Sequence, residues 1–170
     1  MFQTDDYVMH ESAGVCRIAG VESRDFMQSG QAKQYYSLKP LHSPCDSIFV
    51  PVEGDVRMRD ILTRSEATEL IDKIPNIEAD ILDDDSTREQ ICKDALQSFD
   101  CYEWVRIVKS LHLRISLRKQ EGKKPLLTDE KYLMLAEDYL HGELSVALDI
   151  PLDEIGPYIA RKVRESKIDW

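Results

Sequence analysis

Residues 34–50 read QYYSLKPLHSPCDSIFV, and their pattern is the clearest indication of how the first third of the chain folds. Its two ends, Gln34–Leu38 and Ser47–Val50, are short runs of aromatic and β-branched residues, a composition typical of β-strands. The segment between them contains Pro40 and Pro44 and is typical of a turn. The stretch therefore predicts two strands joined by a loop.

The same pattern continues toward the N-terminus. Two further strands are predicted over Tyr7–Met9 and Val15–Val21, with turn signals at Ser12–Gly14 and Gln28–Gln31. Four or five short strands in about 55 residues are too few for a β-sandwich, and they suit a small, strongly bent barrel of the SH3 or Tudor type. Such a barrel usually leaves one strand edge able to pair with another chain.

After residue 57 the pattern changes to amphipathic helices, each with a start signal. Some signals are capping boxes, in which a capping residue is followed three positions later by Glu. The predicted starts are Thr63–Glu66, Ser86–Glu89, the similar Asp100–Glu103, Thr128 as the cap of a helix over about 129–148, and Pro151 in the first turn of the last helix. Gly122 and Pro125 are expected to end the long helix that starts near residue 100. We expect an α+β protein of two domains, a small SH3/Tudor-like β-barrel over residues 1–57 and an all-α helical bundle over residues 58–170.

Hydrophobic periodicity predicts the buried faces of the two longest helices. Steps of four, three and four residues put Trp104, Val108, Leu111 and Ile115 on one face. This spacing makes Trp104 a core residue rather than a functional aromatic. The next helix has a buried stripe composed of Leu133, Ala136, Leu140, Leu144 and Ala147.

The composition excludes several classes of protein. No run approaches 18 apolar residues, so no membrane span is expected, and the N-terminus lacks the pattern of a secretory signal. The four cysteines have no CxxC spacing, which favours reduced thiols in a cytoplasmic protein over disulfides or a zinc site. Because no nucleotide-binding, hydrolase or metalloprotease motif occurs, we expect no enzymatic activity, no cofactor and no metal. Asp83–Asp85 can be read as a metal cluster, but a role at the positive end of the helix that follows explains these acids better.

Positive charge is concentrated in one segment of an acidic chain. The 170 residues carry a net charge of −10, yet residues 106–124 contain seven basic side chains and one acidic one. The overall charge argues against indiscriminate binding to nucleic acid, whereas a local basic patch can attract an anionic partner. The basic residues near the end of the long helix also have a simpler interpretation, since they complement the helix dipole there.

Several local patterns, taken in order, resemble the CarD/CdnL family of bacterial transcription regulators, whose N-terminal module also occurs in transcription-repair coupling factors. The resemblance covers about residues 1–148. It rests on Phe2–Val8, Gly14–Ile18, Val21-Glu22, Gln34–Leu38, Ile48–Val52 and, in the helical part, Leu127–Lys131 with Leu135-Ala136, Leu140 and Glu143-Leu144.

The resemblance implies a partner for each domain. Members of the family dock their Tudor-like module onto the β1 lobe of the RNA polymerase β subunit, and their helical domain contacts promoter DNA and stabilises the open complex. Polymerase contact falls on Arg24, Phe26 and Phe49, although Phe26 and Phe49 can also be read as ordinary barrel core. By this resemblance the protein works in the cytoplasm, at the nucleoid, through RNA polymerase.

For DNA contact, the resemblance and the basic segment are combined. The predicted residues are Arg88, Arg114, Arg118, Lys119, Lys123, Lys124 and Lys131. Several relatives insert a tryptophan into the minor groove. That position falls at Asp84 or Asp85 here, and the only tryptophans are Trp104 and Trp170. DNA contact is therefore expected to be weak and to depend on the polymerase. The alternative is a protein-interaction adaptor that uses the same module on another partner, with little or no DNA contact.

Overall fold

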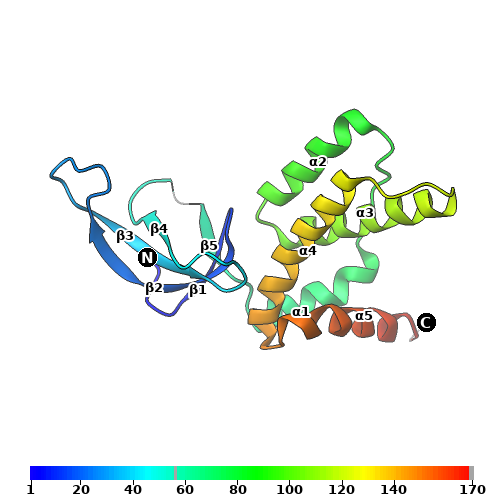
Figure 1. Ribbon diagram of the computed structural model, residues 1–170. Helices are drawn as coiled ribbons and strands as arrows, with labels where there is room; N and C mark the ends of the chain where they lie inside the picture. The colour runs from blue at the N-terminus through cyan, green and yellow to red at the C-terminus, as the bar shows by residue number, and fades with distance from the viewer. Residues whose placement is uncertain (56, 169–170) are drawn as a thin grey trace. The chain divides into compact units, whose positions relative to one another are not determined.

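The computed structural model describes residues 1–55 and 57–168, so Trp170 lies outside the described residues. The chain divides into two compact units, Met1–Ile61 and Leu62–Trp170. The first contains the strands and the second contains the helices (Figure 1). The predicted α+β class is confirmed.

The first unit is a five-stranded antiparallel sheet in the order β4-β3-β2-β1-β5. Its strands are β1 (Tyr7–His10), β2 (Gly14–Arg24), β3 (Lys33–Pro40), β4 (Ile48–Pro51) and β5 (Met58–Asp60). The register between β2 and β3 shifts between Ile18 and Gly20, and a bulge of this kind bends a strand and increases its twist. The pairings make β4 and β5 the two edges of the sheet, and closure into a barrel stays a prediction.

The sheet is stable because alternate side chains gather on one face. They form a core of Val8, Cys16, Ile18, Tyr36, Leu38 and Val50. The first unit reaches Ile61, past the expected boundary at residue 57, because β5 pairs with β1 through Met9 and Arg59. Only three residues long, β5 lacks the alternating run that marks the other strands.

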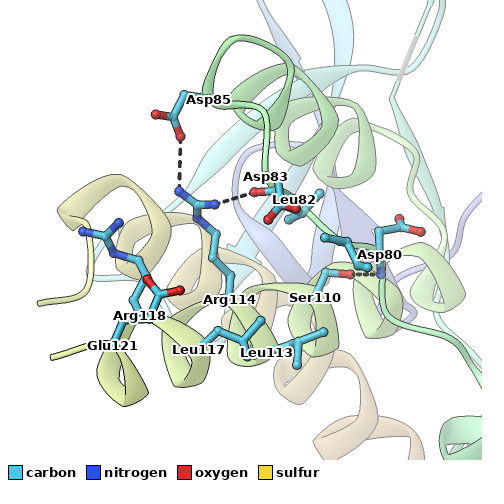
Figure 2. A pocket seen from close by; sticks show the side chains of 11 residues that line it. Asp80, Leu82, Asp83, Asp85, Ser110, Leu113, Arg114, Leu117, Arg118 and Glu121 are labelled. Atoms are coloured by element: carbon cyan, nitrogen blue, oxygen red, sulfur yellow. Dashed lines mark hydrogen bonds and ion pairs between the residues drawn. The ribbon is translucent and has the colours of Figure 1, made fainter. Parts of the chain in front are cut away.

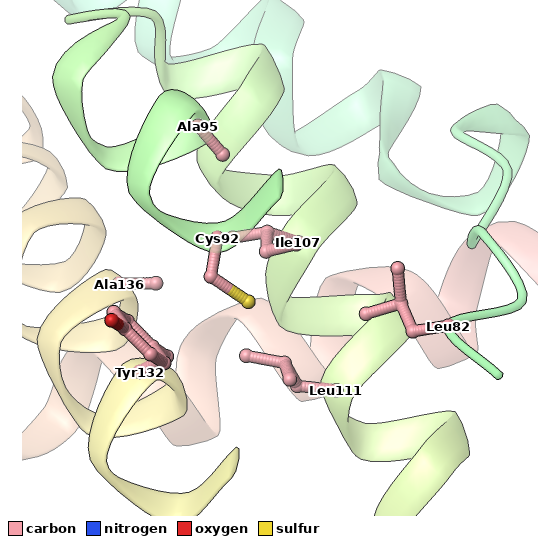
Figure 3. Packing of buried hydrophobic residues seen from close by; sticks show 7 residues of the cluster. All are labelled: Leu82, Cys92, Ala95, Ile107, Leu111, Tyr132 and Ala136. Atoms are coloured by element: carbon pink, nitrogen blue, oxygen red, sulfur yellow. The ribbon is translucent and has the colours of Figure 1, made fainter. Parts of the chain in front are cut away.

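The second unit consists of five α-helices and a short 3-10 helix. They are α1 (Arg64–Lys73), η1 (Ile74–Asn76), α2 (Asp85–Gln97), α3 (Cys101–Gln120), α4 (Leu127–Leu148) and α5 (Leu152–Ile168). Figure 3 shows one core cluster between α2, α3 and α4, formed by Leu82, Cys92, Ala95, Ile107, Leu111, Tyr132 and Ala136. Trp104 is 1% exposed and its ring packs at a tilt against that of Tyr139, which confirms its predicted place in the core.

The helix ends confirm some sequence signals and correct others. The capping box at Thr63 and Glu66 is present, Asp100 caps α3, and Gly122 follows α3 with a left-handed φ of +74°. The second box is wrong, because α2 is capped by Asp84, whose carboxylate accepts bonds from the backbone and hydroxyl of Ser86. A carboxylate two residues earlier outcompetes Ser86 as the acceptor at this helix end.

Thr128 does not cap α4. The helix begins at Leu127, which precedes Thr128, and its N-cap residue Leu126 makes no side-chain hydrogen bond to the helix. Pro151 immediately precedes α5, and its carbonyl accepts the first helical bond, from Glu154. Among the residues that the structure describes, no helix is long and apolar enough to cross a membrane.

Candidate functional site

The three residues predicted to bind the polymerase lie together on the first unit. Arg24 ends β2, Phe26 lies in the turn that follows, and Phe49 belongs to the edge strand β4. Tyr35 of β3 joins them, and we call Arg24, Phe26, Tyr35 and Phe49 the aromatic cluster. In the sheet β3 lies between β2 and the edge strand β4, and the side chains of Arg24 and Phe49 meet across it.

Ring contacts hold the aromatic cluster together. The Phe26 ring meets Tyr35 edge-on at 4.9 Å between centroids and lies 5.5 Å from Phe49. The Arg24 guanidinium lies 5.1 Å from the centroid of the Phe49 ring, within the range of a cation–π contact. Phe26 is nevertheless 55% exposed, so it is not a core residue. An exposed, ordered aromatic group of this kind is typical of a protein-binding surface.

Glu22 fixes the arginine of the aromatic cluster. One carboxylate oxygen of Glu22 accepts bonds from Arg24 Nε at 2.9 Å and from Nη2 at 2.6 Å. Both side chains are about half exposed. The pair leaves Arg24 Nη1 free of this bond and orients the guanidinium toward Glu22.

The turn that carries Phe26 is held by Asp25. The Asp25 carboxylate accepts hydrogen bonds from the backbone N–H groups of Ser29 at 3.1 Å and Gly30 at 2.8 Å. These bonds, led by that from the Ser29 backbone, keep the pKa of Asp25 below its ordinary value. The same bonds are charge-assisted, because the carboxylate that accepts them is ionised at neutral pH.

On the helical unit, the predicted DNA-binding residues divide into two groups. Arg88 and Arg114 are drawn into the interior by Asp129, which is 1% exposed. Arg88 Nε and Arg114 Nε lie 2.8 Å from the two carboxylate oxygens of Asp129. Arg114 also donates to the Leu82 carbonyl, and both arginines contact Asp85. These contacts join α2, α3 and α4, so Arg88 and Arg114 have a structural role.

The other five basic residues are at the surface. Arg118 donates through Nε to the Lys124 carbonyl at 3.0 Å, and Lys123 pairs with Glu121 at 3.1 Å. Lys119 and Lys124 are exposed, and neither forms an ion pair with a residue that the structure describes. The carbonyls at the end of α3 accept backbone N–H groups, including those of residues 121–123. Direct capping by lysine side chains is therefore not needed.

An acidic groove lies beside this basic segment. Figure 2 shows its walls, formed by α3 and by the residues that lead into α2, with Leu113 and Leu117 on the helical side. The groove has a volume of about 280 Å³. Its carboxylates belong to Asp80, Asp83, Asp85 and Glu121. Because Asp84 caps α2 and Asp85 binds arginines, the acidic run is explained without a metal. Within the described ranges no cluster of three metal-ligating side chains occurs.

Some residues of the site escaped prediction from the sequence. Tyr35, Glu22 and Asp129 belong to the patterns that carry the family resemblance, but the sequence assigns them no role in a site, and Asp25 belongs to no pattern. The Asp-x-x-x-Ser-Gly spacing after a strand is a usable signal for an Asp25-type turn, because Asp favours bonds to the backbone a few residues on. No local pattern marks Asp129, since its partners lie on other helices.

The first unit has the features of a small β-sheet module that binds another protein, here through the aromatic cluster. A separate helical unit follows it. Residues 2–62 match the family model described as the CarD-like/TRCF RID domain, so the N-terminal unit is a domain of this family. Domains of this family interact with RNA polymerase, and the match indicates a function related to transcription. A comparison with curated proteins found no match to the chain.

Proposed function

We propose that the protein is a non-enzymatic transcription regulator that binds the β1 lobe of the RNA polymerase β subunit through its N-terminal unit. The aromatic cluster, ordered yet exposed next to the edge strand β4, is the observation that carries the proposal. An edge strand can accept a partner strand through its backbone, and side chains beside it supply specificity. Binding in this way places the protein in the cytoplasm, at the nucleoid.

The helical unit then acts on the promoter and changes the stability of the open complex. Five residues form the proposed DNA surface, namely Arg118, Lys119, Lys123, Lys124 and Lys131. The net charge of −10 opposes binding to DNA by the free protein. Docking on the polymerase raises the local concentration of this small basic surface near DNA, so a contact that is weak alone becomes effective.

Arg24→Glu is expected to weaken binding of the full chain to isolated β1 lobe by about 2 kcal/mol, roughly thirtyfold. The new carboxylate would face Glu22, and the guanidinium over Phe49 would be lost. Titration calorimetry measures the change. Arg17→Glu is the matched control, since it makes the same charge reversal on an exposed side chain of β2 that pairs with Asp5 instead. Equal affinity of the Arg24→Glu and Arg17→Glu proteins would remove Arg24 from the interface.

Changing Lys119, Lys123 and Lys124 together to Gln is expected to abolish the effect of the protein on the lifetime of the polymerase–promoter complex. Each lost phosphate contact also lowers the slope of log affinity against log salt by about 0.9. The fold survives, because backbone groups cap α3.

The matched control changes Lys73, Lys93 and Lys162 to Gln, which removes the same charge elsewhere on the helical unit. If the Lys119/Lys123/Lys124 variant loses a little thermal stability and keeps the full promoter effect, these lysines only complement the helix dipole. If both triple variants lost their effect on the lifetime of the polymerase–promoter complex, the overall charge of the protein would be responsible and not a local contact.

A further inference from the structure

We propose that Asp25 is a positioning residue of the docking surface, because its carboxylate holds the β2–β3 turn in the shape that places Phe26 against Tyr35 and Phe49. The inference rests on the proposed function, since the aromatic cluster is the surface proposed to meet the polymerase. It adds a residue that would set the affinity through the position of Phe26.

Three hydrogen bonds close the turn onto one side chain. Asp25 Oδ1 accepts from the Ser29 backbone N–H at 3.1 Å and from the Ser29 hydroxyl at 3.4 Å, and Oδ2 accepts from the Gly30 N–H at 2.8 Å. The Asp25 carbonyl accepts a further bond from the Gln28 N–H at 3.4 Å. A single residue therefore binds to three of the five residues that follow it.

The turn needs this support because its backbone is unfavourable. Gln28 has φ +52° and Gly30 has φ +77°, both in the left-handed region. Glycine adopts that region freely, whereas glutamine does so at a cost. The bonds to Asp25 offset the cost at Gln28, so without the carboxylate we expect the turn to sample other conformations.

Phe26 is the side chain that depends on the turn. Its ring contacts Tyr35 and Phe49 on one side and is otherwise exposed. If the turn were not held by Asp25, these one-sided contacts would restrain Phe26 less than they do now. A partner that binds a mobile Phe26 must order both the turn and the ring, and that ordering opposes binding. Asp25 lowers this ordering cost, because it holds the turn in place before the partner binds.

The test measures binding of the full-length variants to isolated β1 lobe. Asp25→Ala is expected to raise Kd about tenfold, mainly through faster dissociation. Asp25→Asn should lose less, since its amide oxygen can still accept one of the backbone bonds. Asp6→Ala is the control, because the Asp6 carboxylate accepts a bond from the Gln3 N–H at 2.7 Å elsewhere in the same unit. Its affinity should equal that of the wild type.

A double-mutant cycle separates positioning from a general loss of structure. If Asp25 acts through Phe26, then adding Asp25→Ala to Phe26→Ala should change the affinity by less than twofold. Additive losses in the double variant would overturn the role of Asp25 as a positioner of Phe26. Gly30→Ala gives an independent perturbation of the same turn: the added methyl group meets open space but the positive φ disfavours alanine. It should weaken binding in the same direction, and an unchanged affinity would count against the inference.

The outcomes distinguish the two proposals. A wild-type protein that does not bind the β1 lobe overturns the proposed function. Wild-type binding with an equal affinity for Asp25→Ala overturns only the role of Asp25. Thermal denaturation of each variant shows whether the first unit stays folded. If Asp25→Ala unfolds, Gly30→Ala takes its place in the cycle with Phe26→Ala.

Discussion

Trp104→Ala is expected to lower the free energy of unfolding of the helical unit by about 3–5 kcal/mol, the range found for large buried aromatic residues. Trp104 heads the set of large, fully buried side chains, and its ring lies 5.6 Å from that of Tyr139. Alanine would leave a cavity between α3 and α4 that the surrounding helices can fill only in part. Urea denaturation followed by far-ultraviolet circular dichroism measures the loss.

Tyr102→Ala is the matched control, because Tyr102 is an aromatic residue two positions away on α3 with 43% of its surface exposed. This variant should change the stability by less than about 1 kcal/mol. A Trp104→Ala protein with nearly wild-type stability and a selectively lost promoter effect would show that Trp104 is a functional aromatic and not a core residue.

Asp129→Asn is expected to destabilise the helical unit by about 3–5 kcal/mol, as is typical when one partner of a buried ion pair is removed. The change removes the negative charge between Arg88 and Arg114, whose side chains are 9% and 13% exposed. Asp85 still contacts both arginines, but its own side chain is exposed to solvent and compensates poorly. Urea denaturation again gives the magnitude.

Asp138→Asn serves as the control, because Asp138 lies exposed on the same helix α4. Adding Arg88→Met to Asp129→Asn should recover part of the lost stability, since it removes one of the two uncompensated buried charges. If Asp129→Asn were no more damaging than Asp138→Asn, the contacts of Asp129 would contribute little to the fold. Arg88 and Arg114 would then be available again for the proposed DNA surface.

Local patterns predicted the secondary structure well where the signal repeats over a few residues. The four longer strands, the buried position of Trp104 and the end of α3 at Gly122 all follow from alternation, helical spacing or turn chemistry. Prediction failed where two neighbouring groups compete for the same bonds, as Asp84 and Ser86 do at the start of α2. It also missed β5, whose three residues form a strand only because β1 is beside them.

The candidate site shows the same division. The basic residues at the end of α3 could be found by counting charges, but the sequence could not show which of them are exposed and able to contact DNA. Arg114 and Arg118 are one helical turn apart, but only Arg114 meets the buried carboxylate of Asp129, fifteen residues further along the chain. Similarly, the sequence left Phe26 and Phe49 open between core and surface, because an aromatic residue in a strand or turn serves both uses equally well.

The two-part α+β organisation, the main helices and strands, and the resemblance of the N-terminal unit to a polymerase-binding module could all be predicted from the order of the residues. These features depend on backbone preferences and hydrophobic spacing, which act within a few residues of each position. The folded chain was needed to show that Phe26 is exposed, that Asp25 accepts the bonds of its turn, and that Arg88 and Arg114 bind Asp129 in the interior. Burial and ion pairing depend on which segments pack against one another, and in a folded chain those segments come from positions far apart in sequence.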